Sequence, residues 1–437
     1  MKEKNVRTNM AAKSRHIKSK HKALLVFLIP TLVVMLLFLV YPIIYTVIRS
    51  FYSATGEFVG FNNYLRVFSE PRMLTALRNN AIWVAIVPIT VTFLGLVLAV
   101  LTQKISWSGA FKIILFMPLV VSGLAAGVTF RFMYATNPDI GLINAVTQSA
   151  VHVIQPPGLY PGARPSTDDL VIKEDGSIVI QQNKQLGSQV GFPLIGIRPN
   201  ELSDQAEDVV VPDNINDGIT GAIWSDLKIG GSRGQPESGK KGIPGIKVEV
   251  LEGDSVVAET YTNNEGSFII DDLSSGEYKL RLGESNFRKP FGGFYWLGRK
   301  LVVPSIIFAY IWISTGLALI IIGAGLTSIS EDYLDAARIA GANEFEVFFK
   351  ITVPLLKPVL LVVLVRTIIS VLKIFDLVLV IAPESVQADA TVLALEMWRA
   401  AFGGMRDFGL GSALATILFL LILPVVVSNV KRFKFDQ

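Results

Sequence analysis

Three charged side chains and one serine in a mainly apolar stretch at residues 358–382 fall into a pattern, namely Arg366, Ser370, Lys373 and Asp376. In a continuous helix, which turns by about 100° per residue, these four positions fall within an arc of roughly 120° on one face. Each charge placed in lipid would cost about 2.5–3.5 kcal/mol on insertion scales. The pattern therefore predicts a hydrophilic transport path or a partner-facing surface. The alternative is a Lys373–Asp376 ion pair that only steadies a helix bundle.

A second unusual segment, SISEDYLDAARIAGANEFEVFFKITVPLLKP, covers residues 328–358. Ser330 is a suitable helix N-cap, and Glu331 adds a carboxylate to the first turn, where it favours the helix dipole. We expect Gly341 to end this helix and a second helix at 343–350 to stop at Pro354. A short helix–glycine–helix unit suits docking into a groove of a partner. An ordinary amphipathic loop helix is the alternative.

Motifs for enzymatic chemistry are incomplete. Residues 234–240 match the first seven positions of a phosphate-binding loop, but Lys241 occupies the position at which Ser or Thr would hold magnesium. Asp271 and Asp272 suggest a calcium ligand, although a solvated strand end explains them more simply. The chain has no Cys and three His, which excludes disulfides and thiol catalysis and leaves little material for a His-based metal site. We therefore expect no enzymatic activity, cofactor or metal.

The composition places these residues in a membrane protein. Of the 437 residues, 51% are hydrophobic and 17% are charged, and the mean hydropathy is +0.50. Such values exclude a fully soluble enzyme and a disordered chain. About 20 apolar residues cross a bilayer. The sequence predicts an all-α polytopic bundle of six transmembrane helices, near 24–48, 81–103, 111–134, 301–327, 358–382 and 408–430.

Charge divides the chain into a basic frame and an acidic insert. Residues 135–298 contain 13 Lys and Arg against 22 Asp and Glu. Basic residues gather in a tail at 1–22, in the connection near Lys104 and Lys112, and in a tail at 431–437. Because positive charge favours the cytoplasmic side, we expect both termini to be cytoplasmic and the insert at 135–298 to be extracytoplasmic. The spans then group as 23–134 and 299–430.

Alternating short apolar runs and turn signals predict a β-sandwich at about 209–285 of the insert. Its string GIPGIKVEVLEGDSVVAETYTNNEGSFIIDDLSSGEYKL resembles the Cna-B and carboxypeptidase-regulatory sandwiches of bacterial surface proteins. Residues 141–208 show no pattern that assigns a fold.

The 328–358 segment resembles the ATPase-coupling loop of bacterial ABC importer permeases. Besides Glu331, the residues that match or correspond to that loop are Asp335, Ala336, Ala337, Gly341, Ala342, Phe348 and Pro354. Asp335 replaces the usual Glu with a shorter side chain of the same charge. Ala340 stands where the family usually has Asp, which removes a charge from the expected ATPase contact.

Other parts of the frame, such as Phe116-Met117-Pro118 and Lys373-Ile374-Phe375-Asp376, are similar to the carbohydrate branch of this family. The resemblance implies a permease of the bacterial inner membrane that works by alternating access and carries an oligosaccharide such as maltose or an α-glucoside. It also implies three partners: a cytoplasmic ATPase dimer, a second permease in a heterodimer, and an extracytoplasmic solute-binding protein. Contact with lipid and sugar, but not with nucleic acid, is expected.

Two other classes of membrane protein are alternatives to this interpretation. A surface adhesion or sensor protein would use the sandwich as its working part, yet one span suffices as an anchor. A secondary transporter would be indicated by an inverted repeat of broken spans, which the sequence does not show.

Overall fold

The computed structural model describes residues 28–103, 105, 107–404 and 406–435. The chain divides into two compact units. One combines Met1–Tyr134 with Tyr295–Gln437, and the other is Ala135–Phe294. The second unit corresponds to the expected insert and ends slightly before the expected residue 298. The basic tail at 1–22, Lys104 and the last two residues of the expected C-terminal tail lie outside the described residues.

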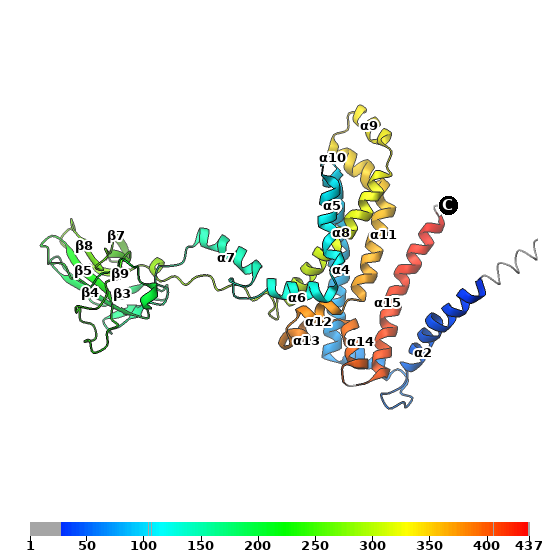
Figure 1. Ribbon diagram of the computed structural model, residues 1–437, viewed down its shortest axis with the longest axis horizontal. Coiled ribbons are helices and arrows are strands. Elements are labelled where there is room, and N and C mark those ends of the chain that lie inside the picture. Colours follow the sequence, from blue (N-terminus) through cyan, green and yellow to red (C-terminus); the bar gives the residue numbers. More distant parts are fainter. Residues whose placement is uncertain (1–27, 104, 106, 405, 436–437) are drawn as a thin grey trace, which may run out of the picture. The chain divides into compact units, whose positions relative to one another are not determined.

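The first unit is helical (Figure 1). Its helices before the insert are α2 (Tyr41–Arg49, preceded by a π-helical turn, Leu36–Val40), α3 (Asn62–Ser69), α4 (Pro71–Gln103), α5 (Ser108–Val120) and α6 (Gly123–Met133). Its helices after the insert are α8 (Val302–Thr327), α9 (Glu331–Ile339), α10 (Glu344–Val347), α11 (Val353–Leu372), α12 (Asp376–Ile381), α13 (Gln387–Ala390), α14 (Leu393–Phe402) and α15 (Phe408–Phe435).

Among the described residues, five helices are long and apolar enough to cross a membrane: Leu28–Arg49, Pro71–Gln103, Val302–Thr327, Glu344–Leu372 and Phe408–Val427. The expected third span differs from a single helix. It consists of α5 and α6, which meet at an angle of 98°. The break has a local cause, because Val121 is extended and the Ser122 side chain accepts a hydrogen bond from the backbone N–H of Ala125, which starts a new helix.

Small residues allow these helices to pack closely around α8, and Figure 1 shows α4, α5, α8 and α11 side by side. A Cβ added at Gly95 of α4 would lie 2.6 Å from the Cβ of Ala318 in α8. A Cβ added at Gly316 of α8 would lie 2.0 Å from the carbonyl oxygen of Leu115 in α5. Within lipid, such close backbone approach is a main source of helix association.

The insert begins with α7 (Leu142–Ile154) and continues into two β-sheets. A four-stranded sheet has the order β1-β4-β5-β8, and a five-stranded sheet has the order β2-β3-β9-β6-β7. All pairings are antiparallel except that of β4 with β5, which is parallel. The strands are β1 (Arg164–Pro165), β2 (Leu170–Ile172), β3 (Ile178–Ile180), β4 (Gln189–Ile195), β5 (Ile219–Ser225), β6 (Lys247–Glu252), β7 (Ser255–Tyr261), β8 (Ser267–Ile270) and β9 (Lys279–Leu282).

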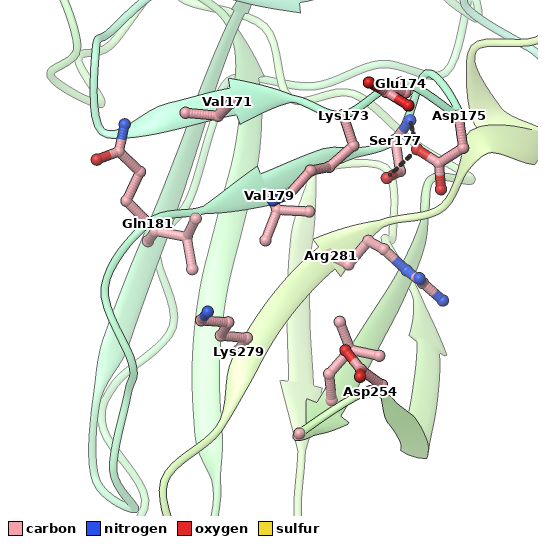
Figure 2. A pocket seen from close by; sticks show the side chains of 13 residues that line it. Val171, Lys173, Glu174, Asp175, Ser177, Val179, Gln181, Asp254, Lys279 and Arg281 are labelled. Atoms are coloured by element: carbon pink, nitrogen blue, oxygen red, sulfur yellow. Dashed lines mark hydrogen bonds between the residues drawn. The ribbon is translucent and has the colours of Figure 1, made fainter.

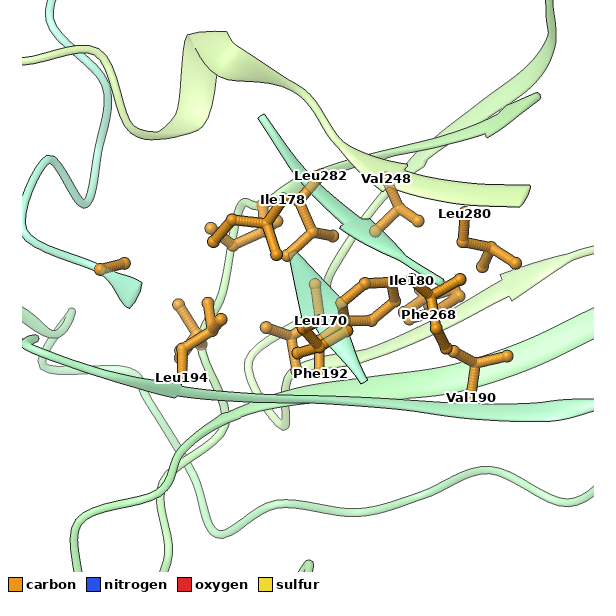
Figure 3. Close-up of a cluster of buried hydrophobic side chains, with 14 of the residues drawn as sticks. Leu170, Ile178, Ile180, Val190, Phe192, Leu194, Val248, Phe268, Leu280 and Leu282 are labelled. Carbon is orange, nitrogen blue, oxygen red and sulfur yellow. The ribbon is translucent and has the colours of Figure 1, made fainter. Parts of the chain in front are cut away.

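Side chains from both sheets form one apolar core, seen in Figure 3. Phe192 of β4 and Leu280 of β9 are fully buried in it, and Phe192 lies 6.4 Å from Phe268 between ring centroids. The strands begin at Arg164, earlier than the expected start near 209. Among the strands before residue 209, β4 contains Pro193, and proline removes a ladder donor and argues against a strand. The resemblance to Cna-B sandwiches stays a prediction.

The two ends of the insert are held together by Asn144 in α7. Its side-chain amide, fully buried, donates to the carbonyl oxygens of Ala135 (2.9 Å) and Phe294 (3.0 Å). Its side-chain oxygen accepts from the backbone N–H of Phe294 at 2.8 Å. The insert therefore closes on itself at the point where the chain enters and leaves it.

Candidate functional site

The expected polar face at 358–382 is split between two helices. Helix α11 ends at Leu372, Lys373 is its C-cap, and α12 begins at Asp376. The single 120° arc predicted for a continuous helix is therefore wrong beyond Ser370. Only Arg366 and Ser370 keep the expected spacing, one helical turn apart on α11.

Two helix breaks meet at Asp376. A Cβ added at Gly123, the first residue of α6, would lie 2.2 Å from Oδ2 of Asp376. A Cβ added at Gly127 would lie 2.9 Å from Cγ1 of Val380 in α12, so the two short helices pack closely. Non-helical backbone at membrane depth is tolerated where it is buried in protein or lines a water-filled cavity. The structure thus contains broken helices, so the argument against a secondary transporter rests on the inverted repeat alone.

Helix α8 adds the hydroxyl group of Tyr310 to this junction. This hydroxyl is within hydrogen-bonding reach of Ser314 on its own helix and of Ser370 on α11, and it is close enough to interact electrostatically with Arg366 and Asp376. Asp376 is half-buried, whereas Arg366 and Lys373 are exposed. Within the described part of the chain, none of these three charged residues forms an ion pair. The Lys373–Asp376 pair that was the structural alternative is therefore not formed.

A different charged group lies in the connection between α12 and α15. Glu396 of α14 is 2% exposed, and its carboxylate lies 2.9 Å from Nε of Arg72 in α4 and 2.9 Å from Nη1 of Arg399. It also accepts a hydrogen bond from the Thr391 hydroxyl. The side-chain amide of Asn79 in α4 donates to the backbone of the same connection, to Thr391 at 2.8 Å. These contacts fasten the connection to α4, and the sequence analysis did not single them out.

The 328–358 segment begins as the sequence predicts. Ser330 is the N-cap of α9, with its hydroxyl accepting from the backbone N–H of Asp332 at 3.3 Å. Helix α9 ends at Ile339, and Gly341 has a φ of +89°, a left-handed conformation that disfavours other residues. Asp335 and Ala336 are exposed, while Ala337 and Ala342 are partly covered.

Arg338 joins the two halves of this segment. Its guanidinium lies 2.9 Å from the carboxylate of Asp335 and 2.8 Å from that of Glu344, at the start of α10. The hydrogen bonds with Glu344 and Asp335 raise the pKa of Arg338. Asn343 caps α10, since its side chain accepts from the backbone N–H of Glu346. The turn at Gly341 is thus bridged on the solvent side.

The second half of the segment does not stop at Pro354. Helix α10 continues through a π-helical turn, Phe348–Thr352, directly into α11, where Pro354 occupies the first turn. Proline has no backbone N–H to donate, and Pro354 lies directly after the π-helical turn, where the regular α-helical hydrogen bonding is already interrupted. Glu344–Leu372 is consequently one run of helix that joins the loop to an apolar span.

The surface of the 328–358 segment exposes large apolar side chains, although the sequence indicated mainly small ones. Phe345 is 73% exposed and Ile339 is 87% exposed. Phe345 and Phe349 have ring centroids 4.5 Å apart, and those of Phe349 and Phe348 are 4.8 Å apart. The sequence analysis missed Phe345, Phe349 and Ile339. The spacing of Phe345 and Phe349 by one helical turn was the signal that could have revealed them.

The residues that resemble a phosphate-binding loop have a structural role in the insert. The ammonium group of Lys240 is 1% exposed and lies 2.6 Å from Oδ1 of Asp226, which is also 1% exposed. It donates to the carbonyl oxygens of Ser232 and Gln235 as well. Burial raises the pKa of Asp226, but hydrogen bonds from Lys240 and Ser166 and from the backbone of Gly234 outweigh burial and hold that pKa below its usual range.

The insert also carries a cavity of about 930 Å³, shown in Figure 2. Val171 and Val179 line it together with charged side chains that include Lys173, Lys279 and Arg281. Arg281 is already engaged, with Nε 2.7 Å from the carboxylate of Glu249. The lining contains no aromatic ring, so the cavity lacks the flat faces on which sugar rings stack.

Comparison with known proteins gives a consistent result. Residues 267–433 match a family described as "Binding-protein-dependent transport system inner membrane component". The osmoprotective compounds uptake permease protein GgtC of Synechocystis sp. is 25% identical over 418 residues, covering 94% of this chain and 99% of that protein. The alpha-glucoside transport system permease protein AglF of Rhizobium meliloti is 25% identical over 411 residues, covering 93% of this chain and 81% of that protein.

The fold is similar to a solved structure as well. A bacterial ABC transporter that imports the acidic polysaccharide alginate has a chain that matches with a TM-score of 0.55 at 13% identity, covering 95% of this chain and 96% of that one. Because the two sequence alignments cover 93% and 94% of this chain, both run through the insert.

Proposed function

Because the chain is an inner-membrane permease of the binding-protein-dependent ABC importers, we propose that its cargo is a carbohydrate, specifically an oligosaccharide such as maltose or an α-glucoside. The alignment over 93% of the chain with a permease named for α-glucoside transport carries this proposal. The chain is the transport subunit and has no catalytic role, so ATP hydrolysis belongs to a partner. The family match favours transport over a surface adhesion or sensor function.

The proposed transport path passes the junction of the two helix breaks. Arg366, Ser370, Lys373 and Asp376 supply polar groups there, and Tyr310 adds a hydroxyl from α8. Unpaired charges inside apolar helices are stable only where water, a partner subunit or a polar cargo meets them. Alternating access would then open this region first to one side of the membrane and then to the other.

The proposed ATPase contact is the segment from Glu331 to Pro354. Asp335, Ala336 and Ala337 lie in α9, Gly341 and Ala342 lie in the turn that follows, and Phe348 comes directly after α10. Phe345 and Ile339 present apolar side chains to solvent. Since the helix runs without a stop from Glu344 to Leu372, a displacement of the loop would be transmitted along α11 toward Arg366. This rigid connection supports a mechanical coupling role.

The remaining proposed partners follow from the orientation expected for the basic tails. Cytoplasmic termini would place the coupling segment beside a cytoplasmic ATPase dimer and the insert outside, where an extracytoplasmic solute-binding protein delivers sugar. A second permease would complete the path in a heterodimer. The charged cavity of Figure 2 makes the insert a candidate contact for the solute-binding protein or the cell envelope.

A paired substitution tests the coupling role. Gly341→Pro, at a φ of +89° that proline cannot adopt, is expected to abolish co-purification of the ATPase and sugar-stimulated ATP hydrolysis. Gly109→Pro in the first turn of α5, where an added Cβ meets nothing within 4 Å, is the control and should retain both. A permease preparation with no associated ATPase would contradict the proposed function.

Substitutions at the helix junction test the path separately. Arg366→Ala and Asp376→Ala should lower sugar uptake into proteoliposomes while the complex with the ATPase stays assembled. Uptake and ATP hydrolysis are measured in parallel, with maltose and an α-glucoside as cargoes. If neither rate changes in an assembled complex, the path does not run through these residues.

A further inference from the structure

A small pocket lies where the first apolar helix ends. It has a volume of about 370 Å³, and its lining includes Tyr45 and Arg49 from α2 and Tyr52 and Thr55 from the turn that follows. A volume of this order falls within the range of small-ligand sites. The pocket is built from residues close together in sequence and belongs to neither the proposed path nor the coupling segment.

Several contacts hold the walls of the pocket in place. The side-chain amide of Asn63 donates to the carbonyl oxygens of Ser50 and Tyr52, both at 2.9 Å. The backbone N–H of Ser53 donates to the carbonyl of Glu57 at 2.7 Å and closes a hairpin. A Cβ added at Gly409 would lie 1.9 Å from the carbonyl oxygen of Tyr52, so the start of α15 presses directly on the turn. The site is therefore formed before any ligand arrives.

Arg49 is the unusual member of this pocket. Its side chain is half-buried, and Nη1 is buried without a hydrogen-bond partner. Across the part of the chain that the structure describes, Arg49 also forms no ion pair. A half-buried guanidinium that no carboxylate of the described residues neutralises favours the binding of a ligand of opposite charge. A guanidinium group is suited to bind phosphate through two parallel hydrogen bonds.

The position of Arg49 along the chain indicates which phosphate it meets. Residues 28–48 contain no charge, and the helix Leu28–Arg49 has a mean hydropathy of 2.5, with no fully buried residue in its most apolar window. Arg49 ends this helix, so it lies at the lipid–water boundary, where tyrosines such as Tyr45 and Tyr52 also gather. Phospholipid phosphates occupy this layer of the membrane.

We propose that the pocket around Arg49 binds the phosphate of an anionic phospholipid headgroup, with Tyr45, Tyr52 and Thr55 beside it as hydroxyl groups. Bound lipid would fix the end of the first span against α3 and α15. This role is independent of which sugar the permease carries.

Native mass spectrometry of the full-length permease tests the proposal, with phosphatidylglycerol titrated against phosphatidylcholine. The wild-type protein should retain phosphatidylglycerol preferentially. Arg49→Gln should weaken that binding by about tenfold, or roughly 1.4 kcal/mol. Arg49→Lys, which keeps the charge without the bidentate geometry, should weaken it by about threefold. Arg131→Gln removes an exposed arginine at the end of α6 and should leave it unchanged.

Three outcomes would overturn the proposal. Equal loss in the Arg49→Gln and Arg131→Gln variants would show that lipid responds to overall charge. Displacement of the lipid by millimolar inorganic phosphate would identify free phosphate as the ligand. Displacement by maltose would assign the pocket to the sugar. An unchanged thermal midpoint of Arg49→Gln in phosphatidylcholine confirms that the variant is folded.

Discussion

The membrane unit contains two groups of charged side chains that differ in burial and in pairing. Glu396 is buried, and its carboxylate is shared between Arg72 and Arg399, each at 2.9 Å. Arg366 is exposed within α11, Lys373 is exposed at the break that ends α11, and Asp376 is half-buried at the start of α12. None of the three is paired within the described residues. Apart from Arg72, which lies in α4 before the insert, the residues of both groups follow the insert and lie within forty residues of each other.

This difference in pairing distinguishes charged residues that stabilise the fold from charged residues that are available to interact with another molecule. A buried, paired carboxylate contributes to stability mainly because removing it would leave its arginines without a partner. A charge with no partner in its own chain contributes little to folding, so its presence in an apolar helix requires another explanation. We expect substitutions in the first group to change stability and those in the second to change transport.

The largest effect is expected for Glu396→Gln. Loss of the carboxylate leaves Arg72 and Arg399 unpaired and should lower the free energy of unfolding by about 3 kcal/mol. Thermal unfolding of the purified permease measures it. Glu384→Gln, an exposed residue of the same connection, is the control. Equal midpoints for both variants would remove the structural role of the Glu396 group.

A second paired charge extends the comparison to the insert. Hydrogen bonds hold the pKa of Asp226 below its unfolded value, so the stability it contributes is complete above about pH 3.9 and is lost as the pH falls through the lowered pKa. The unfolding midpoint of the insert should stay level from pH 7 to 5 and fall more steeply below pH 4 than in Asp226→Asn. Parallel curves for both proteins would contradict this.

An unpaired charge should behave differently. Arg366→Gln breaks no ion pair among the residues that the structure describes, so the unfolding free energy should change by less than about 0.5 kcal/mol. Sugar uptake should fall by about tenfold, equivalent to roughly 1.4 kcal/mol in the barrier. Lys357→Gln, an exposed residue on the same helix, provides the control for uptake. A strongly destabilised Arg366→Gln variant would place Arg366 with the structural charges.

The smallest effect is expected between Lys373 and Asp376. A double-mutant cycle with Lys373→Gln and Asp376→Asn should give a coupling free energy in unfolding near zero, within about 0.3–0.5 kcal/mol, because the two side chains are not paired. The same cycle on Arg72 and Glu396 should give more than about 1 kcal/mol. A large Lys373–Asp376 coupling would restore the ion pair as their explanation.

The sequence predicted some elements closely because their signals are local. The uncharged stretch at 301–327 became α8, Val302–Thr327, and the Ser330 cap and the Gly341 turn lie where their side-chain chemistry requires them. The helix break after Leu372 was not predicted because residues 373–375 contain neither glycine nor proline, so nothing in the local sequence ends the helix.

Contacts between residues that are distant in the sequence could not be predicted from local sequence patterns. Arg72 and Glu396 are far apart in sequence, and only packing of α4 against the connection after α12 brings them together. In the insert, β3 pairs with β9 about a hundred residues later, so neither strand carries the signal of its partner. The exposure of aromatic residues such as Phe345 was not predicted, because the sequence pattern does not show which side chains the fold leaves uncovered.

The hydrogen bonds that Asn144 makes to both ends of the insert affect how the insert can vary in length during evolution. Because Ala135 and Phe294 are bound to the same side chain, the insert starts and ends at one place, and Tyr134 and Trp296 of the helical unit have ring centroids only 6.3 Å apart. Joining two ends that already meet costs chain entropy that grows only slowly with the length between them. The insert is thus an exchangeable cassette: recombination can lengthen, shorten or replace it while the helices on either side keep their register.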